Sequence, residues 1–94
     1  MCAGLILAAL LIACERSPYR SGERDAGTIY MEACLPCHGG STSGPSLTGR
    51  NLSPEAVEKK LRWGGRGMPA FPGIRGQSRR DLVDYVSRLS REGS

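Results

Sequence analysis

Cys34-Leu35-Pro36-Cys37-His38 is the stretch that decides how this chain folds. Two thiols three positions apart, followed directly by an imidazole, form the attachment pattern of a c-type haem. Each thiol adds across one haem vinyl group to form a thioether bond, and the adjacent histidine gives the iron a nitrogen ligand. We therefore predict one haem c, bound covalently through Cys34 and Cys37, with His38 as an axial ligand of the iron.

Other chemistries of a Cys-x-x-Cys pair fit this chain less well. A structural zinc site needs four ligands, and after the N-terminal segment the chain offers three, Cys34, Cys37 and His38. A thioredoxin-like dithiol needs a βαβ framework, and no alternating strand pattern flanks the pair. A disulfide in an exported protein remains open as an alternative, but it leaves the histidine and the glycines after it without a role.

The N-terminal segment predicts export. Residues 1–14 are uncharged and mostly apolar, too short a run to cross a bilayer but of the length of a signal-peptide core. Its end, Leu11-Ile12-Ala13-Cys14, resembles the lipobox of bacterial lipoproteins, so we predict a lipid on Cys14 and an extracytoplasmic location, in the periplasm or on the outer face of the cytoplasmic membrane. No Lys or Arg precedes the apolar run, and an ordinary signal peptide with a soluble product stays open.

The rest of the chain divides into a predicted tether and one domain. Residues 15–26 are rich in charge and have no apolar stripe, which is typical of a flexible linker. Residues 27–94 are expected to form a single small domain, and chains this short bury too little apolar surface to be comfortably stable alone. We expect a haem to supply the missing core.

Helical signals outnumber strand signals in this domain, which predicts an all-α fold. Asp25 caps a first expected helix over residues 25–33. A second is expected over residues 53–63, with Ser53 as N-cap and Pro54 at the favoured first position. A third begins at Ser78, and Leu82, Val86 and Leu89 follow at helical spacing. The Gly- and Pro-rich loops between these helices are expected to wrap the haem.

Met68 is the best candidate for the second axial ligand of the iron. Of the three methionines, Met1 lies in the export signal and Met31 lies one helical turn before Cys34, on the attachment side. Met68 lies in a loop of glycines and prolines that lets the backbone approach a flat group closely. Methionine paired with histidine is the ligand set that raises haem reduction potential. The alternative is that Met68 packs against an apolar surface, as most methionines do.

With these residues in place, the chain resembles a small bacterial class I cytochrome c over nearly all of residues 27–94. Gly27 and Tyr30 match the glycine and aromatic residue of the helix before the haem motif. Tyr85 matches the aromatic residue of the final helix that crosses it. The resemblance implies a small cytochrome c fold, with about three main helices and Gly- and Pro-rich loops around one covalently bound haem.

Two further stretches carry the resemblance to this family. Gly44-Pro45-Ser46-Leu47 matches the Gly-Pro-x-Leu stretch that follows the haem motif. By analogy, the Pro45 carbonyl accepts the proton on the other ring nitrogen of His38, which orients the imidazole and increases its basicity. Met68, with Pro69 and Phe71 after it, matches the loop of the distal ligand.

The basic residues suggest sites for the haem propionates and for a partner. The net charge is +4, and cations outnumber Glu55 and Glu58 between Arg50 and Arg80. Arg50, Arg62, Arg66 and the Trp63 indole N–H are candidates to bind the anionic propionates. The remaining cations would steer an acidic redox partner to the haem edge, although a solvated helix face explains Lys59 and Lys60 equally well. One Trp, one Phe and no recognised module argue against nucleic-acid binding.

Together these features predict a mono-haem electron carrier and not an enzyme. The iron would cycle between Fe(III) and Fe(II) while His38 and Met68 stay bound, and single electrons would pass between extracytoplasmic or membrane redox partners with no small-molecule substrate. Two alternatives stay open: a dedicated haem subunit of a larger respiratory enzyme, and a haem-based sensor of small ligands. A peroxidase is disfavoured because the chain has no second histidine.

Overall fold

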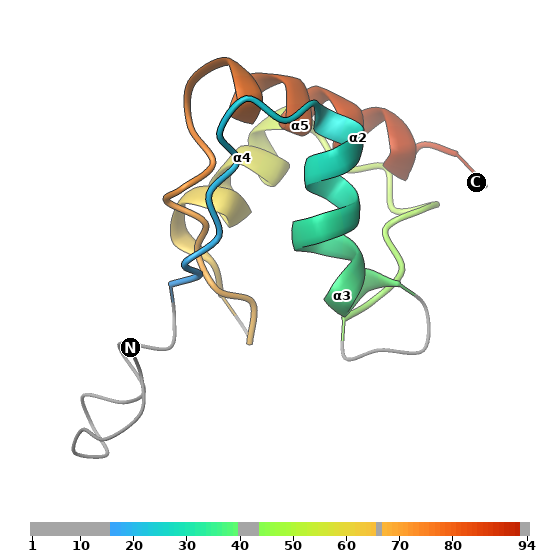
Figure 1. Cartoon of the computed structure of the whole chain (residues 1–94). Coiled ribbons are helices and arrows are strands. Elements are labelled where there is room, and N and C mark those ends of the chain that lie inside the picture. Colours follow the sequence, from blue (N-terminus) through green and yellow to red (C-terminus); the bar gives the residue numbers. More distant parts are fainter. Residues whose placement is uncertain (1–15, 40–43, 66, 93–94) are drawn as a thin grey trace.

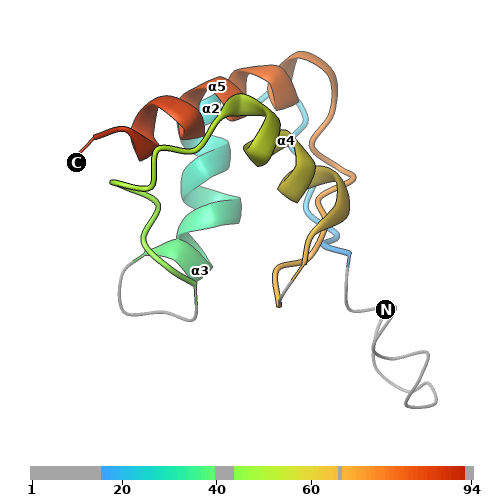
Figure 2. The same ribbon diagram turned by 180° about the vertical axis from the view of Figure 1, so that it is seen from behind.

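The computed structural model describes residues 16–39, 44–65 and 67–92, and within them it is helical, with isolated bridges and no strand. The helices are α2 (Ala26–Ile29), η1 (Tyr30–Cys34), α3 (Leu35–His38), α4 (Pro54–Trp63) and α5 (Gly76–Ser90). Figure 1 shows α2 to α3 as one continuous column that is crossed by α5 near its upper end. Both views show the loop after α4 descending towards the same end of the molecule as α3 (Figures 1 and 2). The predicted all-α class is confirmed.

The first helix begins as predicted but runs further. Asp25 Oδ1 accepts a hydrogen bond from Thr28 N at 2.8 Å, and this bond lowers the pKa of the Asp25 carboxyl. We expected the helix to end at residue 33, but it continues through the haem motif to His38. A π-helical turn makes the connection, in which Leu35 N donates to Tyr30 O. Pro36 lies in the first turn of α3, directly after the π-helical turn, and has no N–H to donate to the preceding turn.

Helix α4 has the predicted bounds and caps. Ser53 Oγ accepts a hydrogen bond from Ala56 N at 3.1 Å, and Pro54 occupies the first position. Gly64 ends the helix with a φ of 71°, a conformation that favours glycine. Val57 and Leu61, four positions apart on one side of the helix, are both buried.

Helix α5 begins two residues earlier than we predicted. It starts at Gly76, and Ser78 does not cap it, because the Ser78 hydroxyl instead donates to Gly22 O at 3.1 Å. Leu82 and Val86 are buried as expected. The crossing with the first helix, which the family resemblance implied, is also present: the rings of Tyr30 and Tyr85 lie with their centroids 5.5 Å apart.

Two buried serines of α5 hold the segment that precedes α4. Ser87 Oγ donates to Leu52 O at 2.8 Å, and Ser90 Oγ accepts from Leu52 N at 2.8 Å. Both serines are almost fully buried, so these bonds satisfy polar groups that would otherwise be costly to bury. The apolar core around them comprises Ile29, Val57, Leu61, Phe71, Ile74, Leu82, Val83 and Val86.

The segment expected to be a tether contacts the domain in this structure. Ser17 N donates to Ala70 O at 2.8 Å, Ser21 N donates to Gly73 O at 3.1 Å, and Ser21 is buried. Residues 16–21 therefore lie against the fold, because their backbone bonds to the segment after Met68 at Ser17 and Ser21. Residues 1–15, with the predicted export signal and Cys14, lie outside the described residues. No helix in the described part of the chain is long and apolar enough to cross a bilayer.

A bidentate ion pair joins α4 to α5 and generates a prediction. Arg79 donates to both carboxylate oxygens of Glu58, at 3.0 and 2.6 Å, and this contact lowers the pKa of Glu58 below its ordinary value of 4.5. Because the folded pKa is the lower one, the pair stabilises the fold above about pH 4.5, and the contribution is lost as the pH falls through the folded value.

We expect Glu58→Gln to lower the free energy of unfolding at pH 7 by about 1 kcal/mol. The difference from the wild type should shrink as both proteins are acidified to pH 3. Urea denaturation of the haem-loaded protein at the two pH values measures it. The control is Asp84→Asn, since Asp84 and its partner Arg88 are both well exposed and such pairs contribute little. An equal loss in both variants would contradict the prediction.

Candidate haem site

The haem motif forms one wall of a cavity of about 350 Å³. Cys34, Cys37 and His38 all line it, from the end of the column of helix. Cys34 is buried, and burial raises the pKa of its thiol to about 11, with a smaller contribution from Cys37. Cys37 is exposed at the edge of the cavity. The predicted attachment residues therefore line the same cavity, with the Cys34 thiol buried inside it and the Cys37 thiol at its edge.

The orientation of His38 is set by a hydrogen bond to the following loop. His38 Nδ1 lies 2.7 Å from Pro45 O. A carbonyl oxygen only accepts, so Nδ1 carries the proton and Nε2 keeps the lone pair that a metal requires. The contact that the family resemblance implied for Pro45 is confirmed, and it leaves the metal-binding nitrogen available on the side away from Pro45.

Gly44 makes this contact sterically feasible. A Cβ atom at Gly44 would lie 2.7 Å from Cys37 O and 3.0 Å from His38 Nδ1. The first distance is shorter than real Cβ contacts and the second is tighter than most of them, so any side chain here would push the backbone at Cys37 or the His38 ring out of place. The backbone also closes this turn directly, since Gly44 N donates to Cys37 O at 2.6 Å.

Met68 lies on the opposite wall, in a loop whose shape depends on glycine. Met68 and Gly65 exchange two backbone hydrogen bonds of 2.9 Å, which close a tight turn. A Cβ at Gly64 would lie 2.6 Å from Met68 O, so this approach also requires glycine. Met31, by contrast, is 64% exposed and lines neither cavity at the motif. The structure therefore brings Met68, and not Met31, to the space that His38 faces.

A second cavity of about 320 Å³ adjoins the first and extends into the core. The two cavities share Cys34, His38, Pro45 and Met68. The second is lined mainly by apolar side chains from three parts of the chain, among them Leu47, Leu52, Val57, Leu61, Leu82 and Val86. Thiols and an imidazole on one side, a thioether on the other and apolar walls between them fit a covalently attached porphyrin.

Three comparisons with known proteins agree with this geometry. The family model described as cytochrome C oxidase, cbb3-type, subunit III matches residues 22–86. The cytochrome c subunit of 4-cresol dehydrogenase (hydroxylating) from Pseudomonas putida is 31% identical over 83 residues, which cover 85% of this chain and 74% of that subunit. A chain in a crystal structure of p-cresol methylhydroxylase with substrate bound matches with a TM-score of 0.60 and 32% identity, covering 70% of this chain and 93% of its own length.

The chain belongs to the cytochrome c family that this family model describes. Membership implies a covalently bound haem c, the cofactor that the motif predicted. The family match begins at residue 22 and ends at residue 86, so it includes the motif, the His38 contact and the Met68 loop.

The candidate propionate-binding residues of this domain divide between the cavity and the surface. Arg50 lines the second cavity, and its Nε donates to Ser46 O at 3.0 Å. Lys60, which a solvated helix face explained equally well, also lines that cavity. Trp63 is 70% exposed and lines neither cavity, so the structure does not bring it to the site. Arg66 lies outside the described residues.

The helical repeat explains why Lys60 lines the second cavity and Trp63 does not. Trp63 is two positions after the buried Leu61, so it projects about 200° around α4, away from the core. Lys60 neighbours Leu61 at about 100°, and its amine reaches the glycine turn: a Cβ at Gly65 would lie 3.3 Å from Lys60 Nζ. Counted from Val57 as well as Leu61, Lys60 lies nearer the apolar side of α4 than Arg62 does, so the helical positions in the sequence distinguish this lysine.

We predict that Gly44→Ala disrupts the site while Gly27→Ala does not. A Cβ at Gly44 collides with the Cys37 carbonyl oxygen and crowds the His38 ring, whereas one at Gly27 meets no atom closer than 4.0 Å. The first variant should mature with less covalently attached haem, and the thermal midpoint of its haem-loaded form should fall by several degrees. Haem absorbance per milligram and thermal denaturation test this. Equal behaviour of the two variants would contradict the role assigned to Gly44.

Proposed function

We propose that this protein is the electron-transfer subunit of a larger redox enzyme, carrying one haem c attached through Cys34 and Cys37 with His38 and Met68 as axial ligands. The observation that carries the proposal is that both axial candidates line the same pair of cavities as Cys34. A bound haem c supplies reversible one-electron transfer between Fe(III) and Fe(II). The chain supplies the ligands and the surroundings.

The two adjoining cavities are here called the crevice. The residues that line the crevice suit electron transfer better than substrate chemistry. Pro45 orients the His38 ring, and the Gly64–Gly65 turn presents Met68, so His38 and Met68 would both serve as ligands of the iron in a bound haem. The apolar walls keep water away from the site. No position is left for a substrate, and we infer that the subunit is not catalytic by itself.

The names of its relatives favour a dedicated subunit over a free carrier. The matched family is described as a subunit of an oxidase, and the Pseudomonas putida relative is the cytochrome c subunit of a dehydrogenase. The relative aligned over 85% of this chain belongs to an enzyme that oxidises an organic substrate. We therefore propose that the partner is a substrate-oxidising subunit that passes electrons singly to this haem.

Charge and location complete the proposal. With a net charge of +4, and with Arg50 and Lys60 at the crevice, the domain would be steered to a partner with an acidic docking surface. The export signal at residues 1–14 would place it outside the cytoplasm. Lipidation at Cys14 would then hold it close to the membrane, since residues 16–22 pair with the domain and add little reach.

We predict that in extracts of the native host the haem protein is found in a complex with a partner. Extracts separated by size should show haem absorbance from this chain at a mass well above that of the single chain. A substrate of the partner, such as a substituted phenol, should reduce that haem in the same fraction. High salt should weaken the association if acidic and basic surfaces dominate it. Elution of all the haem protein at the size of a monomer, at low salt, would contradict the subunit proposal and favour a free carrier.

A further inference from the structure

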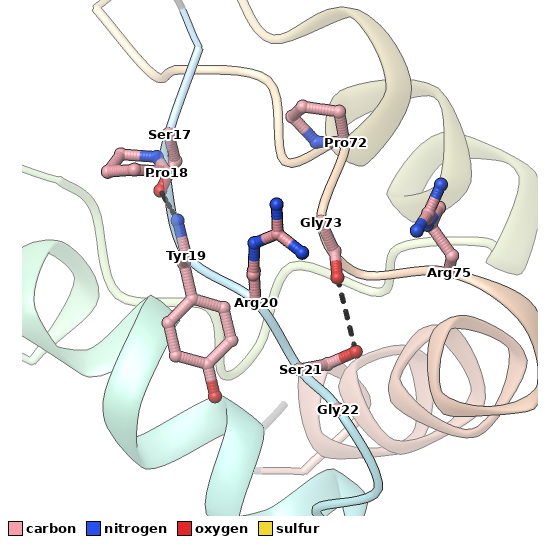
Figure 3. Close-up of a pocket in the computed structure, with 9 residues that line it drawn as sticks. All are labelled: Ser17, Pro18, Tyr19, Arg20, Ser21, Gly22, Pro72, Gly73 and Arg75. Atoms are coloured by element: carbon pink, nitrogen blue, oxygen red, sulfur yellow. Dashed lines mark hydrogen bonds between the residues drawn. The ribbon is translucent and has the colours of Figure 1, made fainter. Parts of the chain in front are cut away.

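Residues 16–22, here called the strap, pair with the segment that follows Met68. Arg16 forms a parallel bridge with Ala70, and Ser17 N donates to Ala70 O at 2.8 Å. Ser21 contributes two bonds to Gly73 O, from its backbone N at 3.1 Å and from its hydroxyl at 3.3 Å. Figure 3 shows the strap running beside this segment, with the hydroxyl bond drawn. The strap therefore holds the chain two residues beyond the candidate distal ligand.

The strap also contacts the wall that carries the haem motif. Tyr19 OH donates to Glu32 Oε1 at 2.7 Å, and Glu32 lies in η1, two residues before Cys34. Figure 3 shows the Tyr19 ring directed from the strap towards this helix. Burial, followed by the bond to Glu32, raises the pKa of Tyr19 to about 12. Just beyond the strap, Arg24 forms an ion pair with the same carboxylate, at 3.2 Å.

The strap fits closely against the segment that follows Met68. A Cβ added at Gly73 would overlap the carbonyl oxygen of Tyr19 and lie 3.2 Å from Arg20 Cα. The far end of the strap is held as well, because Ser78 Oγ of α5 donates to Gly22 O. The strap is thus bonded to the Met68 side, to the motif side and to α5.

We propose that the strap is a positioning element for Met68: it links the two walls of the crevice and keeps the thioether within reach of an iron ligated by His38. The inference rests on the proposed function, because it assumes that Met68 is the sixth ligand. Tyr19 and Gly73 act through the loop and touch no ligand atom. When the strap is loosened, the fraction of molecules with Met68 displaced should rise, and an added ligand should bind that fraction more readily.

Imidazole titration of the ferric haem-loaded protein tests this, followed by the weak red absorption band that reports sulfur–iron coordination. Tyr19→Phe removes the bond to Glu32, and Gly73→Ala displaces the strap backbone. Each should increase the apparent affinity for imidazole by roughly tenfold, as the open population rises by that factor. The band should still be present in both variants before imidazole is added.

The control is Ser53→Ala, which removes the N-cap of α4 and does not touch the strap. It should lower the thermal midpoint as the strap variants do, without changing imidazole affinity. An equal increase in affinity in Ser53→Ala would show that general stability, and not the strap, governs displacement, and would overturn the proposal. The proposal would also be overturned if the wild type shows the band and both strap variants bind imidazole with unchanged affinity. Absence of the band from the wild type would instead refute Met68 ligation, and the strap proposal with it.

Discussion

The hydrogen bond from His38 Nδ1 to Pro45 O is the constraint on which the site depends. It decides which imidazole nitrogen holds the proton and therefore which one is left for a metal. It also determines sequence around it: the residue before Pro45 must be glycine, because a side chain there meets the ring and the Cys37 carbonyl. Gly44 and Pro45 are thus held by contact with the imidazole that the motif itself supplies.

The remaining structure holds the Met68 loop opposite that histidine. Ser87 and Ser90 bond the backbone of Leu52, which places α4 against α5, and the Glu58–Arg79 pair reinforces the same contact. From the end of α4, Phe71 N donates to Leu61 O at 2.8 Å and brings the chain back beside the helix. The distal loop is therefore held by α4 on one side and by residues 16–22 on the other.

Much of this arrangement was predictable from local sequence signals. The Ser53 and Asp25 caps each depend on residues within a few positions of one another, and each was found where expected. The Pro45 contact was predictable through family resemblance. The start of helix α5 was less predictable, because Ser78 has the chemistry of a cap but its hydroxyl donates to Gly22 O instead.

Long-range backbone pairing was not predictable in this way. Residues 16–22 have the composition of a linker, and nothing within the segment indicates that Ser17 and Ser21 bond Ala70 and Gly73. Charge alone also did not single out Lys60, which lines the second cavity although a solvated helix face explained it equally well. Composition carries no information about a backbone partner far along the chain, and for Lys60 the helical position, not the charge, holds the signal.

The central claim is that His38 and Met68 occupy the two axial positions of one haem, and the absorption spectrum of the purified protein tests it most directly. The ferric wild type should show the weak red band of sulfur–iron coordination, Met31→Ala should keep it and Met68→Ala should lose it. The reduced wild type should also resist carbon monoxide, unlike a ligand sensor. A Met68→Ala protein with an unchanged band would contradict the account.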